Sequence, residues 1–427
     1  MQIYDLIQKT RRNQTLTKDE ITYLVNGFTN GEIPDYLMSA WLMAVCCQGL
    51  TDEETLNLTL TMRDSGECLD LSGIGGITVD KHSTGGIGDK TTLLIAPIVA
   101  ACGGFVPKMS GRGLGFTGGT IDKLESIPGF SVNLSVPEFI QQVRNIGCAV
   151  ISQSGNLTPA DKKIYALRNL TATVDSIPLI CSSIMSKKLA LGADCILLDV
   201  KCGNGAFMKT PESAEALAQS MVTIGNLAGK QCRAIITDMN QPLGHAVGNA
   251  LEIKEVIKIL QNQEQNALSE LSVELSAHML ALSGKGELSS CREMALNALT
   301  SGKALEKFMA MIQAQGGNLS KLPEAKFQKA FNAPQSGYIT EIHSEQIGLA
   351  CLELGAGKTA SRQEIDYSAG IVFCHDVGDK IQHGETLAII HGSSESLCEA
   401  AEQRLLQAVQ IQDSSAPEQN LILKMIG

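Results

Sequence analysis

Two glycine-rich loops lie close together in the sequence, and each combines bare backbone with lysine and hydroxyl side chains. The first is KHSTGGIGDK at residues 81–90, and the second is KMSGRGLGFTGGT at residues 108–120. Glycine adopts positive φ and lets backbone N–H groups approach a ligand closely, and successive exposed N–H groups bind anions. The first loop is neither a Walker A loop nor a Rossmann fingerprint. The pair of loops predicts a single phosphate held from two sides.

The segments before several loops have the pattern of short strands. Apolar runs at 77–79, 195–200 and 233–237 each precede a polar or glycine-containing loop, and helical stretches separate them. This repeated order of strand, loop and helix is typical of an α/β fold with a largely parallel sheet. Ligands of such sheets bind beyond the carboxyl ends of the strands, which is where all three loops lie.

Residues 1–65 are expected to form helices. The sequences TKDE at 17–20 and TDEE at 51–54 are capping boxes, because each places a hydroxyl at the N-cap and Glu at N3. These boxes predict helices that begin just after Thr17 and Thr51.

A second helical segment covers residues 155–195. The sequence TPAD at 158–161 predicts a helix start, with a Thr cap, Pro at the first position and a carboxylate at the third. This helix is expected to run through Leu170. The next helix includes 182–191 and ends at Gly192, since glycine is a common residue just after a helix.

Composition excludes several classes of function. The 427 residues are 44% hydrophobic and 19% charged, which is typical of a folded protein with two or three domains. A net charge of −11 and an aromatic content of 4% argue against nucleic-acid binding. The thirteen cysteines contain no C-x-x-C pair and indicate reduced thiols. With no signal-peptide pattern and no apolar run long enough for a bilayer, we expect a cytoplasmic protein without membrane contact.

The C-terminal part of the chain, from about residue 333, has a different sequence pattern. Short predicted strands and glycine turns follow one another there, at 334–340, 370–373, 377–381 and 384–390. This order resembles the small β hammerhead of biotinyl and lipoyl carriers. A carrier needs a lysine at the hairpin tip, and the segment 374–376 (CHD) offers none. We therefore predict a structural module and no carrier function.

Lysine and hydroxyl side chains in and beside the two loops are suited to a phosphate. Lysine supplies a point charge, and hydroxyl groups supply directed hydrogen bonds. The candidate phosphate ligands are Lys81, Ser83, Thr92, Lys108, Ser110 and Thr120. A single glycine-rich loop is often only a tight turn, so the repeated spacing of lysine and serine carries this prediction.

Two further pairs of polar residues share helical faces. Tyr165 and Arg168 are three residues apart, and Ser183 and Lys187 are four apart. From the spacing alone, an ordinary partly exposed helical pair is the commoner explanation for each. A lone His82 is equally explained as a structural histidine.

Together these motifs resemble the thymidine and pyrimidine nucleoside phosphorylases. The longest is SGRGLGFTGGTIDKLE at 110–125. Shorter matching runs are at 81–89, 165–168, 183–188, 199–207, 238–244 and 337–338. The resemblance spans essentially the whole chain.

The resemblance implies three domains. They are a helical domain (1–65 and 155–195), a larger α/β domain with a mixed, largely parallel sheet (66–154 and 196–330), and a C-terminal α+β, hammerhead-like domain (331–427). It also implies reversible phosphorolysis, in which a pyrimidine nucleoside and inorganic phosphate give the free base and an α-pentose 1-phosphate. No cofactor is required for this reaction. Family members are homodimers that close by a hinge motion.

The resemblance also assigns roles to residues. The implied catalytic residues are His82, Arg168 and Lys187. The implied base ligands are Tyr165, Arg168, Ser183 and Lys187. The implied phosphate ligands are Lys81, Ser83, Thr92, Lys108, Met109, Ser110 and Thr120. Arg168 and Lys187 would stabilise the negative charge of the departing base, and His82 would donate a proton or hydrogen bond to its O2.

Two residues depart from the family pattern close to these ligands. Phe116 stands where the family commonly has His, inside the second loop. Asn169 replaces a usual Asp, which predicts a looser orientation of Arg168. Arg112, with Asp122 and Glu125, is expected only to order the second loop.

Some bacterial family members hold a monovalent cation, K⁺, and the resemblance implies where it would bind. The corresponding positions are Gly88, Lys90, Leu243, Ala246 and Glu255. Position 90 is lysine here, where threonine is common. The sequence leaves two alternatives open: the backbone carbonyl groups bind the ion, or the lysine side chain excludes it.

Lys108 bears on substrate range. Strict thymidine phosphorylases tend to have methionine there, whereas the broader pyrimidine nucleoside phosphorylases have lysine, which can reach a ribose 2′-OH. We therefore expect uridine to be accepted as well as thymidine. The alternatives are a strict thymidine phosphorylase, a transferase like anthranilate phosphoribosyltransferase, which lacks the third domain, and a nucleoside-binding module without catalysis.

Overall fold

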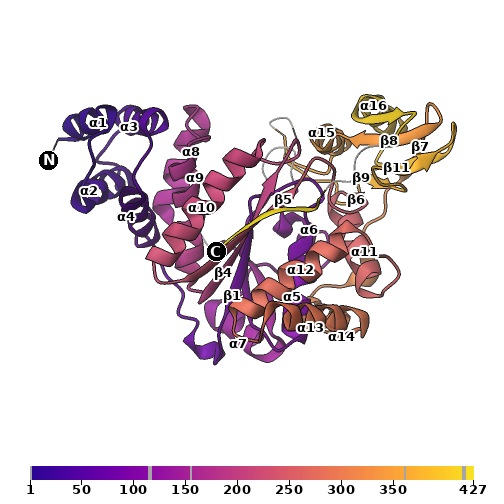
Figure 1. The fold of residues 1–427 in the computed structure, drawn as a ribbon, viewed down its shortest axis with the longest axis horizontal. Helices are drawn as coiled ribbons and strands as arrows, with labels where there is room; N and C mark the ends of the chain where they lie inside the picture. Colours follow the sequence, from indigo (N-terminus) through magenta and orange to yellow (C-terminus); the bar gives the residue numbers. More distant parts are fainter. Residues whose placement is uncertain (1, 114–117, 154–155, 360–361, 416–419) are drawn as a thin grey trace.

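The computed structural model describes residues 2–113, 118–153, 156–359, 362–415 and 420–427. Figure 1 shows N-terminal helices at one end, a sheet with its covering helices in the middle, and most of the C-terminal strands at the other end, whereas the C-terminus itself lies beside the central sheet. No helix among the described residues is both long and apolar enough to cross a membrane. All thirteen cysteines are free thiols.

Four helices form the N-terminal region: α1 (Ile3–Arg11), α2 (Lys18–Thr29), α3 (Asp35–Gln48) and α4 (Asp52–Arg63). Both predicted capping boxes are confirmed. Thr17 and Thr51 each accept a hydrogen bond from the backbone three residues on, and Glu20 and Glu54 bond back to them. Trp41 is fully buried in the core of this bundle, where its indole N–H donates to the hydroxyl of Thr10 at 3.1 Å.

Helices α8 (Pro159–Leu170) and α9 (Ile177–Leu191) lie beside this bundle. Their predicted ends are confirmed, and Gly192 has the left-handed conformation that ends α9. The predicted cap at Thr158 is wrong, because its side chain makes no capping bond and its φ is 45°. Ile164 of α8 and Leu179 of α9 pack into the N-terminal core, whereas Met185 of α9 packs against the central sheet. Helix α9 therefore connects the helical and α/β regions.

The central sheet has the strand order β1–β4–β5–β13. Its strands are β1 (Val79–Ser83), β4 (Cys195–Cys202), β5 (Gln231–Asp238) and β13 (Ile422–Ile426). The first three are parallel, and β13 is antiparallel to β5. Strands β2 (Val106–Ser110) and β3 (Cys148–Ser152) form a second parallel pair. The predicted largely parallel α/β sheet is confirmed, but β13 lies in it rather than with the C-terminal module to which the sequence assigned it.

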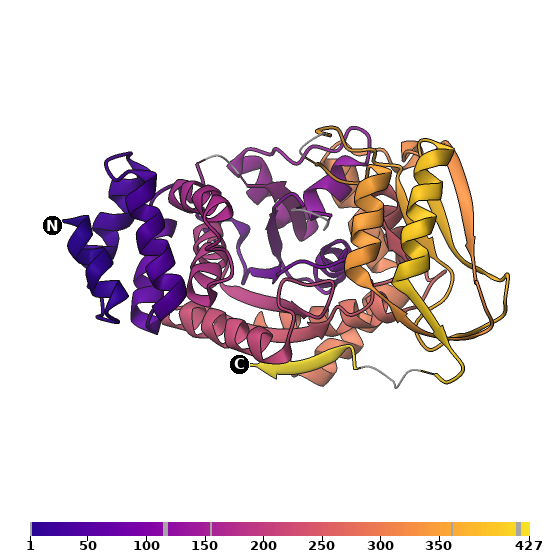
Figure 2. The same ribbon diagram turned by 90° about the horizontal axis from the view of Figure 1, so that it is seen from above.

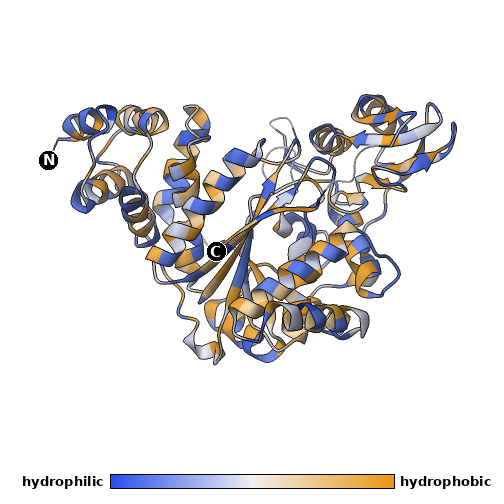
Figure 3. Ribbon diagram, viewed as in Figure 1, coloured by the Kyte–Doolittle hydropathy of each residue, from blue (hydrophilic) through white to orange (hydrophobic). Residues whose placement is uncertain are grey.

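Alternate residues of β4 face two separate cores. Leu197 belongs to the cluster with helices α5 (Thr91–Ala101) and α12 (Ala267–Leu282). Ile196 and Leu198 belong to the cluster with α9 and α10 (Pro211–Leu227). Figure 3 shows hydrophobic residues on the central strands and alternating with hydrophilic ones on the covering helices. The helices of this region are α5 (Thr91–Ala101), α6 (Thr120–Glu125), α7 (Val136–Ile146), α10 (Pro211–Leu227), α11 (Asn249–Leu260), α12 (Ala267–Leu282), α13 (Leu288–Thr300) and α14 (Lys303–Ala314), with 3₁₀ turns Ser72–Ile74 and Leu319–Lys321. By the same alternation, Asp199 shares the face of Leu197 but lies near the carboxyl end of the strand.

The C-terminal region contains two small antiparallel sheets with strand orders β6–β9–β11–β7 and β10–β8–β12. The strands are β6 (Ala246–Val247), β7 (Phe327–Asn332), β8 (Gly337–Ile342), β9 (Gly370–Phe373), β10 (Lys380–Ile381), β11 (Thr386–Gly392) and β12 (Val409–Gln412). Helices α15 (Ser344–Leu354) and α16 (Glu395–Ala408) lie side by side against them (Figure 2). Because β6 comes from the α/β part of the chain and pairs with β9, the two regions share a sheet.

Candidate active site

The first glycine-rich loop follows β1, and its lysine is deeply buried. The parallel register of β1 and β4 places Lys81 opposite Leu197 and Ser83 opposite Asp199. The ammonium of Lys81 lies 2.7 Å from Asp199 and donates to the hydroxyl of Thr91 at 2.6 Å. Ser83 donates to Asp89 at 2.5 Å and accepts from Gly85 N–H at 3.1 Å, which closes the loop on itself.

The second loop follows β2, and its lysine meets the first loop. Lys108 is buried, and its ammonium donates to the carbonyl of Lys81 and to Asp80 at 3.3 Å. Lys188 of α9 approaches the same carboxylate at 2.7 Å and donates to the carbonyl of Met109 at 3.3 Å. Asp80 thus joins both loops to the helical region. Burial lowers the pKa of Lys108 to about 7, although Asp80 opposes that shift.

Positive charge exceeds negative charge in this buried cluster. Its ammonium groups belong to Lys81, Lys108, Lys188 and Lys201, and its carboxylates belong to Asp80, Asp89 and Asp199. Burial alone would raise the pKa of Asp89, but Lys81, Lys201 and hydrogen bonds from Ser83 and Thr91 lower it well below its usual range. Asp89 is therefore an anion, and the four lysines outnumber the three carboxylates, which suits the cluster to a further anion.

His82 lies where the two loops and α9 meet. Burial lowers its pKa well below the usual value, and the positive charges of Lys188, Lys108, Lys81 and Lys187 add to this shift. Its Nε2 atom is buried and has no hydrogen-bond partner among the described residues. His82 is therefore neutral at pH 7 and carries an unused polar atom in a strongly positive environment. Burial makes any histidine neutral, but a satisfied structural histidine would not leave a buried nitrogen without a partner.

Arg168 is held from behind by the backbone. Its guanidinium donates to the carbonyl groups of Thr173 at 3.1 Å, Val174 at 2.8 Å and Leu179 at 3.0 Å. These carbonyls set its orientation, and none comes from position 169; the loosening by Asn169 stays a prediction. Arginine has five N–H donors, and two remain for another acceptor. The ring of Tyr165 stacks on the guanidinium with 5.6 Å from carbon to centroid.

Lys187 forms a group with Ser183, which the sequence predicted as its neighbour, and with Asp161, which it did not. Its ammonium lies 2.5 Å from Asp161 of α8 and 3.0 Å from the hydroxyl of Ser183. Asp161, predicted as a helix-start residue, instead orients Lys187, and its second oxygen is buried without a partner among the described residues. Burial lowers the pKa of Arg168, and Asp161 opposes that shift from nearby. The predicted base ligands are thus gathered around one carboxylate.

The structure places the remaining predicted ligands at the edges of this cluster. Met109 and Ser110 end β2 and are buried, Thr92 lies in the first turn of α5, and Thr120 begins α6. Phe116 falls outside the described residues. Sequence reasoning missed Asp80, Asp161, Lys188 and Lys201 as site residues. Their only sequence signal was membership of the matching runs or proximity to them.

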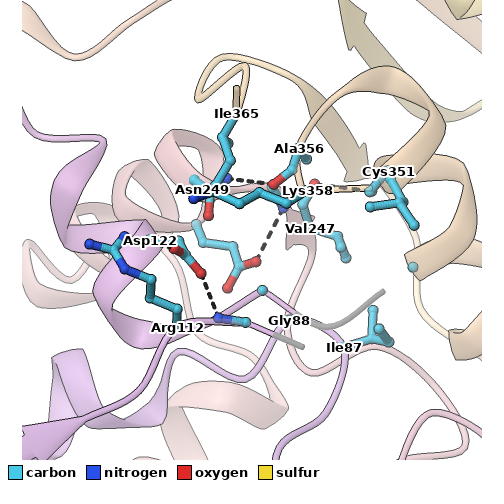
Figure 4. Close-up of a pocket in the computed structure, with 17 residues that line it drawn as sticks. Ile87, Gly88, Arg112, Asp122, Val247, Asn249, Cys351, Ala356, Lys358 and Ile365 are labelled. Carbon is cyan, nitrogen blue, oxygen red and sulfur yellow. Dashed lines mark hydrogen bonds and ion pairs between the residues drawn. The ribbon is translucent and has the colours of Figure 1, made fainter. Parts of the chain in front are cut away.

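A cavity of about 150 Å³ lies behind the second loop, against the C-terminal region. Figure 4 shows Arg112 and Asp122 on one side of it and Cys351 and Lys358 on the other. None of the predicted base or phosphate ligands lines this cavity. Arg112 pairs with Glu125 and Asp122, and Asp122 accepts from Gly113 N–H, so these residues order the loop as expected.

Among the described residues, one group of side chains has the spacing of metal ligands: His245, Glu255 and Glu264. His245 bonds to Glu264 at 2.8 Å and to Asp376 at 3.2 Å. Hydrogen bonds to Asp376 and Glu264 raise the pKa of His245 to about 10. The imidazole is therefore protonated at neutral pH and offers no lone pair to a metal ion.

Comparison with known proteins gives matches along the whole chain. Three family models match in order: "Glycosyl transferase family, helical bundle domain" at residues 4–66, "Glycosyl transferase family, a/b domain" at 75–305, and "Pyrimidine nucleoside phosphorylase C-terminal domain" at 338–412. The pyrimidine-nucleoside phosphorylase of Staphylococcus haemolyticus is 51% identical over 433 residues, which covers 100% of both chains. This chain belongs to the pyrimidine-nucleoside phosphorylase family. Pyrimidine-nucleoside phosphorylase of Staphylococcus epidermidis is 53% identical over 404 residues, covering 93% of each chain.

The family membership makes the chain a glycosyltransferase enzyme, as predicted. A solved structure of anthranilate phosphoribosyltransferase from Thermus thermophilus has a similar fold, with a TM-score of 0.59 and 17% identity. The match covers 98% of that chain but 72% of this one. The likeness therefore concerns the fold, and the C-terminal match at 338–412 distinguishes this chain from that transferase.

Proposed function

We propose that the chain catalyses the reversible phosphorolysis of pyrimidine nucleosides, giving the free base and an α-pentose 1-phosphate. The observation that carries the proposal is the position of His82, which is buried among lysines of the two glycine-rich loops and of α9 and whose Nε2 atom has no partner among the described residues. A phosphate at the loops and a base beside α9 would both lie near it. The sugar would then span the space between them.

The proposed chemistry needs no covalent nucleophile. Phosphate attacks C1′ as the glycosidic bond breaks, and the bonding electrons leave with the base. Lys187 and the two unused N–H groups of Arg168 would stabilise the resulting negative charge on the base. Ser183 would hydrogen-bond the ring edge. The excess positive charge at the loops would hold the phosphate dianion in line for attack.

His82 would act through a hydrogen bond. Because its pKa lies well below the usual value, the imidazole is neutral at pH 7 and has one N–H to offer. A neutral donor can stabilise charge developing on O2 of the base without transferring its proton. Of the two roles that the resemblance implied for His82, proton donor and hydrogen-bond donor, we therefore propose the second.

The test of the proposed function is a phosphate-dependent release of base. Thymidine is incubated with the enzyme with and without inorganic phosphate, and free thymine is measured by chromatography. Release only with phosphate supports phosphorolysis. Thymidine binding without release would support a non-catalytic module, and no binding at all would reopen the phosphoribosyltransferase alternative.

We propose that uridine is a substrate alongside thymidine. The ammonium of Lys108 donates to the carbonyl of Lys81 in the first loop, and this position beside the proposed phosphate site supports a contact with the sugar. The substitution Lys108→Met is expected to lower kcat/KM for uridine more than for thymidine, because only ribose has a 2′-OH. Equal losses on both substrates, or no activity of the wild type on uridine, would contradict this.

Phosphate binding is expected to weaken as the pH rises past about 7. Lys108 loses its proton there in the free enzyme, and a bound dianion must restore it, since an anion raises the pKa of a nearby ammonium. The measurement is KM for phosphate against pH in the wild type and in Lys108→Met. Their ratio cancels the ionisation of phosphate itself. A ratio that does not change with pH would rule out this role.

The enzyme is also proposed to act in the cytoplasm as a homodimer, as the family resemblance implied. Thirteen free cysteines and the absence of a membrane-spanning helix among the described residues support the compartment. Sedimentation analysis of the purified chain tests the dimer.

A further inference from the structure

Lys90 places a buried positive charge directly behind the first glycine-rich loop. The residue precedes α5, and its side chain is fully buried. Three oxygens surround its nitrogen: the carbonyl of Leu243 at 2.7 Å, the carbonyl of Ala246 at 2.8 Å, and Oε2 of Glu255 at 2.6 Å. An ammonium has three N–H donors, so these three acceptors satisfy it completely.

Glu255 is saturated by its other partners. Its Oε1 accepts from the backbone N–H of His245 at 2.7 Å and from the side chain of Asn266 at 2.9 Å. Its Oε2 accepts from the backbone N–H of Ala246 at 2.9 Å in addition to Lys90. With four hydrogen bonds, the carboxylate has no oxygen left for another cation.

The backbone is packed closely around this ion pair. At Gly244, with φ 73°, an added Cβ would lie 2.4 Å from Oε1 of Glu255 and 3.0 Å from Nζ of Lys90. At Gly88, with φ 71°, an added Cβ would lie 2.8 Å from the carbonyl oxygen of Leu243. Both turns therefore approach the ammonium in conformations that favour glycine, and they leave little space beside it.

These are the positions at which the family resemblance implied K⁺. Carbonyl and carboxylate oxygens are suitable ligands because they replace the hydration shell of such an ion. In this chain, however, the same oxygens already bind an ammonium, and a second positive charge beside it would be repelled. The residues present do not fit a resident monovalent cation.

We propose that the ammonium of Lys90 is a built-in substitute for that cation, so that this enzyme folds and works without K⁺. The charge tethers the turn 243–246 to the first loop. That turn leads into β6, which pairs with β9 of the C-terminal region. A cation supplied by the chain keeps this connection intact whatever the ionic composition of the solution.

The first experiment uses the wild-type enzyme. Its thermal midpoint and its phosphorolysis rate are measured in KCl and in tetramethylammonium chloride at equal ionic strength. We expect both quantities to be the same in the two salts. A higher midpoint specific to K⁺ would overturn the proposal, whether or not the enzyme proves active, because a ligand that binds the native state raises its stability.

The second experiment changes Lys90. The substitution Lys90→Thr removes the ammonium and opens space at the oxygens, so we expect a lowered thermal midpoint that K⁺ specifically restores by several degrees. The matched control Lys90→Met also removes the charge but fills the space, so K⁺ is expected to leave its midpoint unchanged. A folded Lys90→Thr variant that ignores K⁺ would contradict the proposal. If neither variant folds, the wild-type result decides.

Discussion

Replacing Lys187 by methionine is expected to lower kcat by about 10²–10³-fold, the range for removing one stabilising donor from a developing anion. Methionine keeps most of the length of the side chain but removes its charge. Lys187 is positioned for this task by Asp161 at 2.5 Å and Ser183 at 3.0 Å. The loss should fall on kcat, because the charge on the base develops only as the glycosidic bond breaks. Steady-state kinetics with thymidine measure it.

The matched control is Lys162→Met, which removes an exposed lysine of α8 next to Asp161. This variant should retain wild-type kcat. Asp161→Asn should reduce kcat less than Lys187→Met does, and combining the two should add little, because both changes disable one unit. Independent, additive losses would show that Asp161 does not act through Lys187.

Replacing Asp199 by asparagine is expected to destabilise the protein by about 3–5 kcal/mol, the cost of breaking a buried ion pair from one side. The carboxylate lies 2.7 Å from Lys81 and 2.8 Å from Lys201, and neither lysine side chain is exposed. Asparagine can still accept from the hydroxyl of Thr237, which is 2.7 Å away in the wild type. The loss would therefore report two buried ammonium groups without their nearest carboxylate, since Asp89 lies 3.9 Å from Lys81.

Unfolding in urea followed by circular dichroism measures this change, since the single tryptophan, Trp41, reports only on the N-terminal helices. The control is Asp64→Asn, at an exposed carboxylate paired with Arg63. Surface pairs of this kind contribute about 0–1 kcal/mol. A similar small effect at Asp199 would mean that solvent reaches Lys81 and Lys201 in solution.

Local signals in the sequence predicted much of the fold. The capping boxes at Thr17 and Thr51 and the helix end at Gly192 depend on hydrogen bonds within a few residues, so the sequence shows them directly. The predicted cap at Thr158 was wrong, because the backbone there has a left-handed conformation that the local sequence pattern does not show. Asp161 does lie in the first turn of the helix that begins at Pro159, but its carboxylate pairs with a lysine 26 residues away.

The same distinction between local and distant contacts applies to the candidate site. The sequence found both glycine-rich loops and their lysines, because an anion-binding loop is a contiguous motif. It did not find that Asp199 neutralises Lys81, or that Lys188 reaches Asp80 from 108 residues away. Such pairs are formed by strand register and helix packing, and they leave no regular spacing along the chain.

Contiguous motifs were enough to predict the α/β class, the two anion-binding loops and the resemblance that implied a phosphorolysis reaction. The tertiary structure alone decided the charge states, because burial and neighbouring charges set each pKa. Burial keeps His82 neutral and lowers the pKa of Lys108 to about 7. Helix packing brings Asp161 into an ion pair with Lys187. The tertiary structure also resolved what Lys90 does among the oxygens of Leu243, Ala246 and Glu255, since only the folded chain brings those distant groups together.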